Sequence, residues 1–372
     1  MNKKHNFVDL AETHKGQGTL YCGGLDPHLF NGFEKNMEVY GPASNIYNGD
    51  LFLCTAAYYQ RLGDFIPNLE KEDIGRYATV LAAVEMYTKR VVEILVTKCN
   101  IRVFKPQSGF YEQFGPMGNI LLGRVRNYIK ELEEKLSIRI ICLLDCKRGD
   151  IATTQEAYLI SLIGGLNKLG INYKPYDFDI INVTPWMGRD VMVLGNNEKP
   201  GLGLQLMREG KGIIVVNKSS NPSGPEYQEE LLQNCGMTLQ MKNVADLYAI
   251  NQQFELEYDG LSTIGMVVGS THICDGSIRK AFPSTTLLVP GFGAQGGKFD
   301  RIMQELIPEG KWTGQGAIFS ASRATMFAFE KEYGGSGVVA NLEEDLMNGI
   351  SAFRKSEKKA YEVAGINYPF TA

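Results

Sequence analysis

Acidic and basic side chains alternate in one short segment that follows an apolar run. Asp145, Lys147 and Asp150 come directly after residues 140–144, which read as a buried strand. Strand side chains alternate between two faces, so we expect Asp145 and Lys147 to point the same way. Gly149 then lets the chain turn, so that Asp150 leaves in a new direction. A fixed ammonium group between carboxylates suits chemistry that develops negative charge on a substrate.

A second lysine, Lys105, ends another short apolar run. Two ammonium and two carboxylate groups can alternate in space, so that opposite neighbours hold each charge ionised. A buried network of this kind costs desolvation and is a poor way to gain stability. We therefore interpret Lys105, Asp145, Lys147 and Asp150 as a candidate catalytic group.

A glycine-rich segment, 290–297, and Arg323 together suggest an anion site. Its glycines would let backbone N–H groups approach an anion closely, and a guanidinium can hold a phosphate with two hydrogen bonds. The segment also matches Gly-x-Gly-x-x-Gly, but the strand after it carries no acid for a ribose, so a dinucleotide site is disfavoured.

Other polar residues at strand ends have two open interpretations. The Asp26 carboxylate could hydrogen-bond ribose hydroxyls, or it could cap a helix before Pro27. Ser220 could contact a polar ring edge or cap a turn, and Gln107 lies at a similar strand end. The four histidines have no metal-ligand spacing, so neither a histidine metal site nor a Ser-His-Asp triad is expected.

These candidates fall at the ends of eight short runs rich in Val, Ile and Leu: 20–26, 103–107, 140–147, 180–185, 213–220, 264–269, 287–291 and 317–322. Amphipathic helical patterns lie between many of them, at 77–98, 121–136 and 153–169. Strands alternating with helices predict an α/β fold, a (β/α)₈ barrel, whose chemistry lies at the carboxyl ends of the strands. The amino ends of the same runs are expected to lack a comparable polar set.

The chain of 372 residues is longer than the roughly 250 that such a barrel uses. We predict one barrel domain over 1–372, with insertions near 30–75, 188–212 and 221–260 and a final helix at 342–360. The third insertion is expected to hold two short helices.

Composition excludes several classes of function. The formal net charge of −4 gives no sign of electrostatic binding to nucleic acid or to an anionic membrane. The seven cysteines are scattered and form no Cys-x-x-Cys pair, which favours a reducing compartment over a disulfide scaffold or zinc ribbon. With no apolar run near the length of a membrane span, we expect a soluble cytoplasmic protein.

The charged motifs, in this order along the chain, resemble the orotidine 5′-monophosphate decarboxylase family. The resemblance rests on Asp145-x-Lys147-x-x-Asp150-Ile151, Lys105 on the preceding strand, the Gly-Ala-Gln295-Gly loop and Arg323. It spans roughly residues 19–326. The segments 104–107 and 218–222 resemble the longer branch of the family, which includes certain bacterial and protozoan enzymes.

The resemblance implies that orotidine 5′-phosphate loses CO₂ to give UMP without a metal or organic cofactor. It also implies a homodimer with shared sites. Lys105, Asp145 and Lys147 would come from one subunit, and Asp150, Ile151 and Thr154 would reach into the partner's site.

Further roles follow from the resemblance alone. Asp26 would hold the ribose, Ser220 the pyrimidine edge, and Gln295 with Arg323 the phosphate. The backbone near Pro290 would line the ring, and Gln107 belongs to the same substrate-binding set.

Two alternatives remain. One is a related barrel enzyme that decarboxylates or cleaves a sugar phosphate through a metal-bound intermediate, against which Lys105, Ser220 and the loop with Gln295 argue. The other is a non-catalytic nucleotide-binding barrel, which the intact set of four charged residues disfavours.

Overall fold

Eight parallel strands form a closed barrel in this computed structural model, which describes residues 5–41, 49–63, 65–167, 170–271, 275–291, 299–306 and 316–370. Around the barrel the order is β1-β10-β9-β8-β5-β4-β3-β2. The strands are β1 (Tyr21–Leu25), β2 (Val103–Pro106), β3 (Ile141–Arg148), β4 (Ile180–Val183), β5 (Gly212–Lys218), β8 (Ile264–Val268), β9 (Thr286–Pro290) and β10 (Ala317–Ala321). The predicted barrel is confirmed, because each of the apolar runs overlaps one of its strands.

Strand side chains alternate between the inside of the barrel and the layer beneath the helices. Ile141 and Leu143 of β3 pack in the inner cluster, whereas Cys142, Leu144 and Cys146 pack in the outer one. Cys142 and Cys146 are therefore buried core residues that lie on the face of β3 opposite to Ile141 and Leu143.

The long helices between the strands occur close to their expected positions. They are α4 (Ile74–Thr97) and α6 (Pro116–Leu136). The helix expected at 153–169 is shorter, because α7 (Ala152–Leu159) continues as a π-helical turn (Ile160–Gly164) and ends where Gly165 adopts a φ of 132°. Smaller helical segments are α5 (Gly109–Glu112), α11 (Ser277–Ala281), α12 (Phe299–Leu306), α13 (Arg323–Met326), η6 (Lys331–Tyr333) and η7 (Val339–Asn341).

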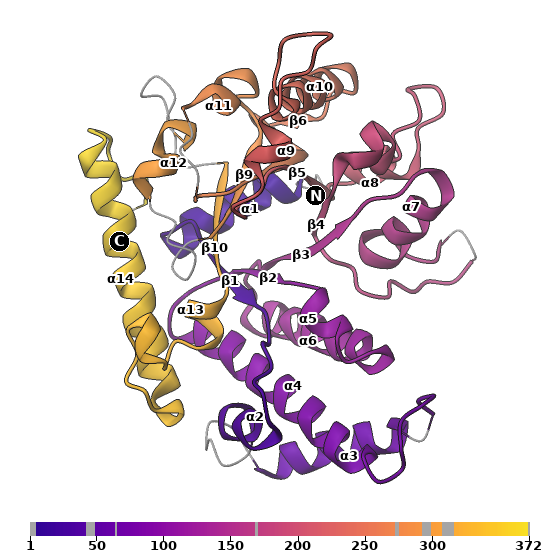
Figure 1. Cartoon of the computed structure of the whole chain (residues 1–372), viewed down its shortest axis with the longest axis vertical. Coiled ribbons are helices and arrows are strands. Elements are labelled where there is room, and N and C mark those ends of the chain that lie inside the picture. Colours follow the sequence, from indigo (N-terminus) through magenta and orange to yellow (C-terminus); the bar gives the residue numbers. More distant parts are fainter. Residues whose placement is uncertain are drawn as a thin grey trace.

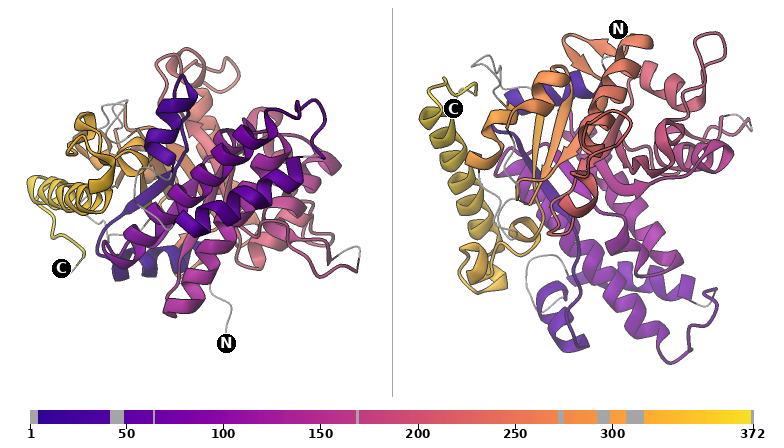
Figure 2. Two further views of the ribbon diagram at one scale, coloured as in Figure 1. Left: turned by 90° about the horizontal axis from the view of Figure 1, so that it is seen from below. Right: turned by 45° about the horizontal axis from the view of Figure 1, so that its top comes forward.

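Additional helices surround the barrel on several sides (Figure 1). In the first expected insertion, α2 (Phe33–Tyr40) and α3 (Gly49–Gly63) pack on α4. Figure 2 shows this layer on one side of the barrel and α14 (Leu342–Val363) on another. Among the helices that the structure describes, none has the length and apolar character needed to cross a membrane.

The other insertions lie near the carboxyl ends of β4 and β5. The second contains η4 (Pro185–Met192) and α8 (Leu202–Arg208). The third contains α9 (Pro225–Gln228), α10 (Leu239–Gln253) and the antiparallel pair β6 (Glu257–Tyr258) and β7 (Leu261–Ser262). Only one of its two helices is short, since α10 runs for 15 residues.

The amino end of the barrel is closed by α1 (Asn6–Gln17), a helix that the sequence analysis did not predict. Its Phe7 and Leu10 are buried in the inner barrel cluster. Because α1 fills this end with apolar side chains, the barrel opens toward solvent at its carboxyl end.

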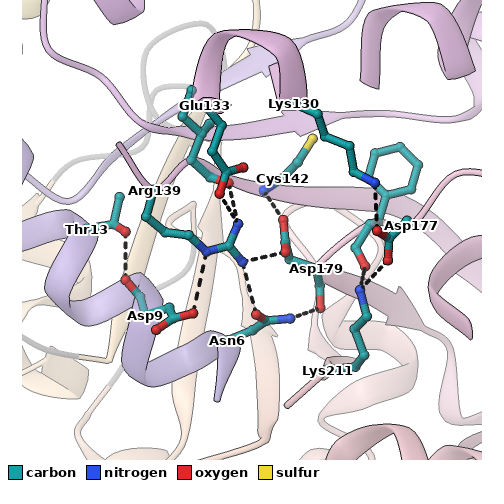
Figure 3. A network of polar contacts seen from close by, with 12 residues as sticks. Asn6, Asp9, Thr13, Lys130, Glu133, Arg139, Cys142, Asp177, Asp179 and Lys211 are labelled. Carbon is teal, nitrogen blue, oxygen red and sulfur yellow. Dashed lines mark hydrogen bonds and ion pairs between the residues drawn. The ribbon is translucent and has the colours of Figure 1, made fainter. Parts of the chain in front are cut away.

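The expectation that the amino ends lack a polar set is wrong (Figure 3). Arg139, just before β3, donates to Asp179, just before β4, at 2.6 Å. The same guanidinium contacts Asp9 and Asn6 of α1 at 3.5 and 3.2 Å. These residues hold α1 on the barrel, so this charged network has a structural explanation and polarity alone does not distinguish the two ends.

Candidate active site

A cavity of about 310 Å³ opens at the carboxyl ends of the barrel strands. Most of the predicted site residues line it, although they are distant in sequence. Those that line it are Asp26, Lys105, Gln107, Asp145, Lys147, Ser220, Pro290 and Arg323. The fold therefore brings together the charged and polar side chains that the strand ends predicted.

Asp145 is the centre of the charged group. Its Oδ2 accepts a hydrogen bond from Lys105 Nζ at 2.9 Å, and its Oδ1 accepts one from Lys147 Nζ at 2.5 Å. Lys105 is only 3% exposed, whereas the Lys147 side chain is 48% exposed. One ammonium group is thus locked inside the barrel, and the other faces the cavity where a substrate can reach it.

Charge pairing outweighs burial at this site. Burial alone would raise the pKa of Asp145, but the ammonium groups of Lys105 and Lys147 hold that pKa well below its usual range. Burial would likewise lower the pKa of Lys105, but the carboxylates of Asp145 and Asp26 raise it above its usual value. The Asp145–Lys105 pair therefore stays ionised at neutral pH and presents fixed charges to a ligand.

Asn182 of β4 supports this group and was missed by the sequence analysis. Its Nδ2 donates to Asp145 Oδ1 at 2.7 Å, and its Oδ1 accepts from the backbone N–H groups of Cys146 and Lys147 at 2.8 and 2.7 Å. Lys147 has a φ of 45°, a left-handed conformation that costs free energy for a residue with a side chain. The sequence feature that could have indicated this role is a single asparagine within the otherwise apolar strand β4.

Strand β3 ends at Arg148, directly before Gly149, as the sequence predicted. A Cβ on Gly149 would lie 2.3 Å from Thr184 Oγ1, so a side chain does not fit there. Beyond Gly149, the backbone N–H of Asp150 donates to Gln155 Oε1 at 3.1 Å, and Asp150 Oδ1 accepts from the N–H of Ile151 at 2.7 Å.

Asp150, Ile151 and Thr154 do not line the cavity of their own chain. Ile151 is 49% exposed, and Thr154 is exposed as well. The single chain thus separates this trio from Lys105, Asp145 and Lys147, and their predicted role in a partner's site remains a prediction.

Asp26 presents an unsatisfied acceptor to the cavity. It is 6% exposed, and its Oδ1 has no hydrogen-bond partner among the described residues. The same holds for Ser320 Oγ of β10, which also lines the cavity and was not predicted. Buried polar atoms without partners are costly, so both atoms are candidates for hydrogen bonds to a ligand.

An aromatic and imidazole pair beside Asp26 was also missed by the sequence analysis. The His28 ring lies over Phe110, with ring centroids 4.1 Å apart, and both residues line the cavity. Burial lowers the pKa of the His28 imidazole, although Asp26 opposes this shift. The pair forms one wall of the site.

The predicted anion site is described in part. Arg323 lines the cavity at the start of α13, next to Pro290 and Gly291 at the end of β9. Gly24 allows this arrangement, because a Cβ there would lie 2.2 Å from Ser322 Oγ. Gln295 lies outside the described residues.

The two remaining polar candidates already have local contacts. Gln107 Oε1 accepts a hydrogen bond from the backbone N–H of Gly109, at the start of α5. The backbone O of Ser220 accepts a hydrogen bond from Thr271 Oγ1 at 2.8 Å. The backbone N–H of the neighbouring Ser219 donates to Gln228 Oε1 at 2.9 Å. Both segments are therefore fixed at the cavity rim.

The chain is similar to known proteins both in sequence and in fold. The family model of orotidine 5′-phosphate decarboxylase / HUMPS proteins matches residues 81–331. The chain belongs to this family. A relative from Rhodopirellula baltica named orotidine 5′-phosphate decarboxylase is 33% identical over 248 residues, which cover 66% of this chain and 74% of the relative. A second relative of that name, from Caldicellulosiruptor saccharolyticus, is 27% identical, with 87% of this chain and 90% of the relative covered.

Solved structures of similar fold support the architecture. The orotidine 5′-monophosphate decarboxylase of Plasmodium berghei aligns with a TM-score of 0.66 at 16% identity, covering 97% of this chain and 100% of that one. The OMP decarboxylase of Leishmania donovani aligns with a TM-score of 0.56 at 21% identity, covering 94% and 98%. Nearly the whole chain, insertions included, thus follows a fold already seen in this family.

Proposed function

We propose that this chain is an orotidine 5′-phosphate decarboxylase in which Lys147 is the catalytic acid. Family membership supports the reaction, which gives UMP and CO₂. The observation that carries the assignment of Lys147 is its ammonium group, half exposed in the cavity and anchored by Asp145 at 2.5 Å.

The chemistry of the reaction matches this arrangement. The bond between the pyrimidine ring and the carboxyl carbon breaks, CO₂ leaves, and the electron pair stays on the ring carbon. A preorganised cation beside that carbon stabilises the developing charge in a site shielded from water. Lys147 then gives a proton to the ring carbon and regains one from solvent, so that no metal or organic cofactor is required.

Asp145 and Lys105 have supporting roles in this proposal. Asp145 orients the Lys147 ammonium, and the buried Lys105 keeps Asp145 ionised by pairing with its second oxygen at 2.9 Å. Because the Lys105–Asp145 pair is formed before any ligand arrives, little reorganisation is needed during the reaction.

The remaining cavity residues would position the substrate. The unsatisfied Asp26 carboxylate suits ribose hydroxyls, and Arg323 suits the phosphate by two parallel hydrogen bonds. Gln295 is proposed as a second phosphate ligand, and Ser220, Gln107 and Pro290 as contacts to the pyrimidine. Binding energy at the phosphate, remote from the reacting carbon, would orient the ring for reaction.

We further propose a homodimer with shared active sites in the cytoplasm. Asp150, Ile151 and Thr154 do not line their own cavity, and Ile151 exposes half of an apolar side chain. A partner chain would bury that side chain and bring Asp150 to the Lys147 of the other subunit. The location is supported by the described cysteines, which are unpaired.

The test is to follow the loss of orotate-ring absorbance with micromolar orotidine 5′-phosphate, with and without EDTA. The proposal expects equal turnover in both samples. Turnover that EDTA abolishes and a divalent metal restores would favour the metal-dependent sugar-phosphate branch of the superfamily. Tight UMP binding without turnover would favour a non-catalytic barrel.

A further inference from the structure

A second cavity, of about 680 Å³, lies beside the active site but outside the barrel wall. Its lining comes from η4, β5, α9 and α10. On β5, Val215 and Asn217 face this second cavity, whereas Val216 borders both cavities. None of the predicted catalytic or substrate-binding residues lines it, so the proposed decarboxylation leaves it unexplained.

Buried carboxamides distinguish this cavity from a packing defect. Asn217 is 3% exposed, and its Oδ1 accepts a hydrogen bond from Asn243 Nδ2 at 2.9 Å. Its own Nδ2 has no partner within the described ranges, and neither does Gln240 Oε1. A donor and an acceptor thus remain unsatisfied in one cavity, where leaving each of them unpaired is costly.

Buried apolar side chains line much of the cavity, and charge is confined to the rim. Leu247 and Ile250 of α10 are buried and line the cavity. Lys242 forms an ion pair with Asp246 on the same helix, and Arg189 is exposed. An interior with amide groups but no unpaired charge favours a neutral ligand over an anion.

Two aromatic rings lie at the mouth of the cavity. Trp186 and Tyr227 both line it, with ring centroids 5.4 Å apart and planes tilted by 46°. They are 69% and 55% exposed, respectively. Exposed aromatic faces of this kind stack against planar heterocycles.

We propose that this cavity is a second ligand site, which takes an uncharged purine nucleoside. The adenine or guanine ring carries donors and acceptors on its edges, which suit the free donor of Asn217 and the free acceptor of Gln240, and its faces suit the aromatic mouth. The volume lies within the range of small-molecule sites, so a nucleoside can fit. This inference does not depend on the proposed decarboxylation.

The test is isothermal titration of the full-length chain with adenosine and with guanosine, each with and without saturating UMP. One site per chain is expected for at least one of the two nucleosides, with an affinity that UMP leaves unchanged. Absence of binding at millimolar concentrations of both nucleosides would overturn the proposal. So would binding that UMP displaces, because the nucleoside would then occupy the active site.

Three variants locate the site. Asn217→Leu removes the unsatisfied donor at similar volume and is expected to weaken binding by about tenfold or more. Ile250→Trp fills the cavity and is expected to abolish binding, whereas Gln252→Trp on the exposed side of the same helix is the matched control and should bind normally. Trp186→Leu changes an exposed side chain, so it tests the aromatic mouth even if a buried variant fails to fold. Unchanged affinity in the folded variants at Asn217, Ile250 and Trp186 would contradict the assignment.

Discussion

Asn182 Nδ2 and Asp145 Oδ1 are joined by a hydrogen bond of 2.7 Å between neighbouring strands β4 and β3. The oxygen of the same carboxamide accepts from the backbone of Lys147 at 2.7 Å. One buried side chain therefore fixes both the carboxylate that anchors the proposed catalytic ammonium and the left-handed backbone that carries it. We interpret Asn182 as a positioning residue for Lys147.

Replacing Asn182 tests that role. In Asn182→Leu, two backbone N–H groups and the Asp145 carboxylate each lose a hydrogen-bond partner. We therefore expect the free energy of unfolding to fall by about 1–3 kcal/mol. A displacement of the ammonium by about 1 Å is expected to lower kcat by about 100-fold, while KM for orotidine 5′-phosphate changes little. Steady-state kinetics and urea unfolding measure both effects. A variant that loses stability but keeps the normal kcat would show that Asn182 is only structural.

Acid stability should depend on the Lys105–Asp145 pair. The pKa of Asp145 is lowered in the folded protein, so its contribution to stability is present above the unfolded value of about 3.9 and is lost as pH falls through the folded value. The pKa of Lys105 is raised, so its contribution is present below about 10.4 and is lost as pH rises through its folded value.

Lys105→Met removes one of the two cations that hold Asp145 ionised. The pKa of Asp145 should rise, and the acid-unfolding midpoint measured by circular dichroism should move to higher pH. In the wild-type protein, the contribution of this pair to the free energy of unfolding should be constant between about pH 5 and pH 9, since neither group titrates there. An acid midpoint that is the same in both proteins would contradict the proposed coupling.

Subunit complementation tests the shared site. Lys105→Ala and Asp150→Ala chains should each be inactive alone, because every site in either homodimer lacks one charged residue. In a mixed dimer, one of the two sites contains neither substitution, so activity should return to about half of the wild-type value per dimer. Heterodimers purified with two different affinity tags provide the measurement. No recovery in such heterodimers would argue that each chain forms its site by itself.

The charged network at the amino end should affect stability and leave catalysis alone. Asp179 is 5% exposed and accepts hydrogen bonds from Arg139 at 2.6 Å and from the backbone of Cys142 at 2.8 Å. Asp179→Ala should lower the free energy of unfolding by about 3–5 kcal/mol, because the buried guanidinium of Arg126 would lose its nearby carboxylate. Glu226→Ala, at an exposed position, is the control. Urea unfolding and KM measured on the folded fraction distinguish this result from damage to the active site.

The barrel and the charged group could be predicted because their signals are local. Apolar runs that end in polar residues mark parallel strands, and closure of the barrel brings those ends together. Strand alternation was enough to place Asp145 and Lys147 on the same side of their strand. The end of strand β3 before Gly149 also followed from the sequence, and a side chain at Gly149 would strike Thr184.

What the sequence did not reveal depends on contacts between distant segments. Asn182 is important because of its hydrogen bonds to residues of β3, and the residues next to it in the sequence do not indicate those partners. The helix α1 was missed because its role, to close the barrel, depends on contacts with distant strands. Arg139 and Asp179 are far apart in the sequence and meet only when β3 and β4 pair. Ser320 likewise comes to line the same cavity as Asp26 only after β10 pairs with β1.

Lys147→Ala gives the most direct test of the central claim, that one anchored ammonium stabilises and protonates the ring carbon as CO₂ departs. Turnover of orotidine 5′-phosphate should be abolished while UMP still binds, and Lys199→Ala, at an exposed lysine of the second insertion, should behave as wild type. Turnover by Lys147→Ala at the wild-type rate, measured by loss of orotate-ring absorbance under saturating substrate, would contradict the account.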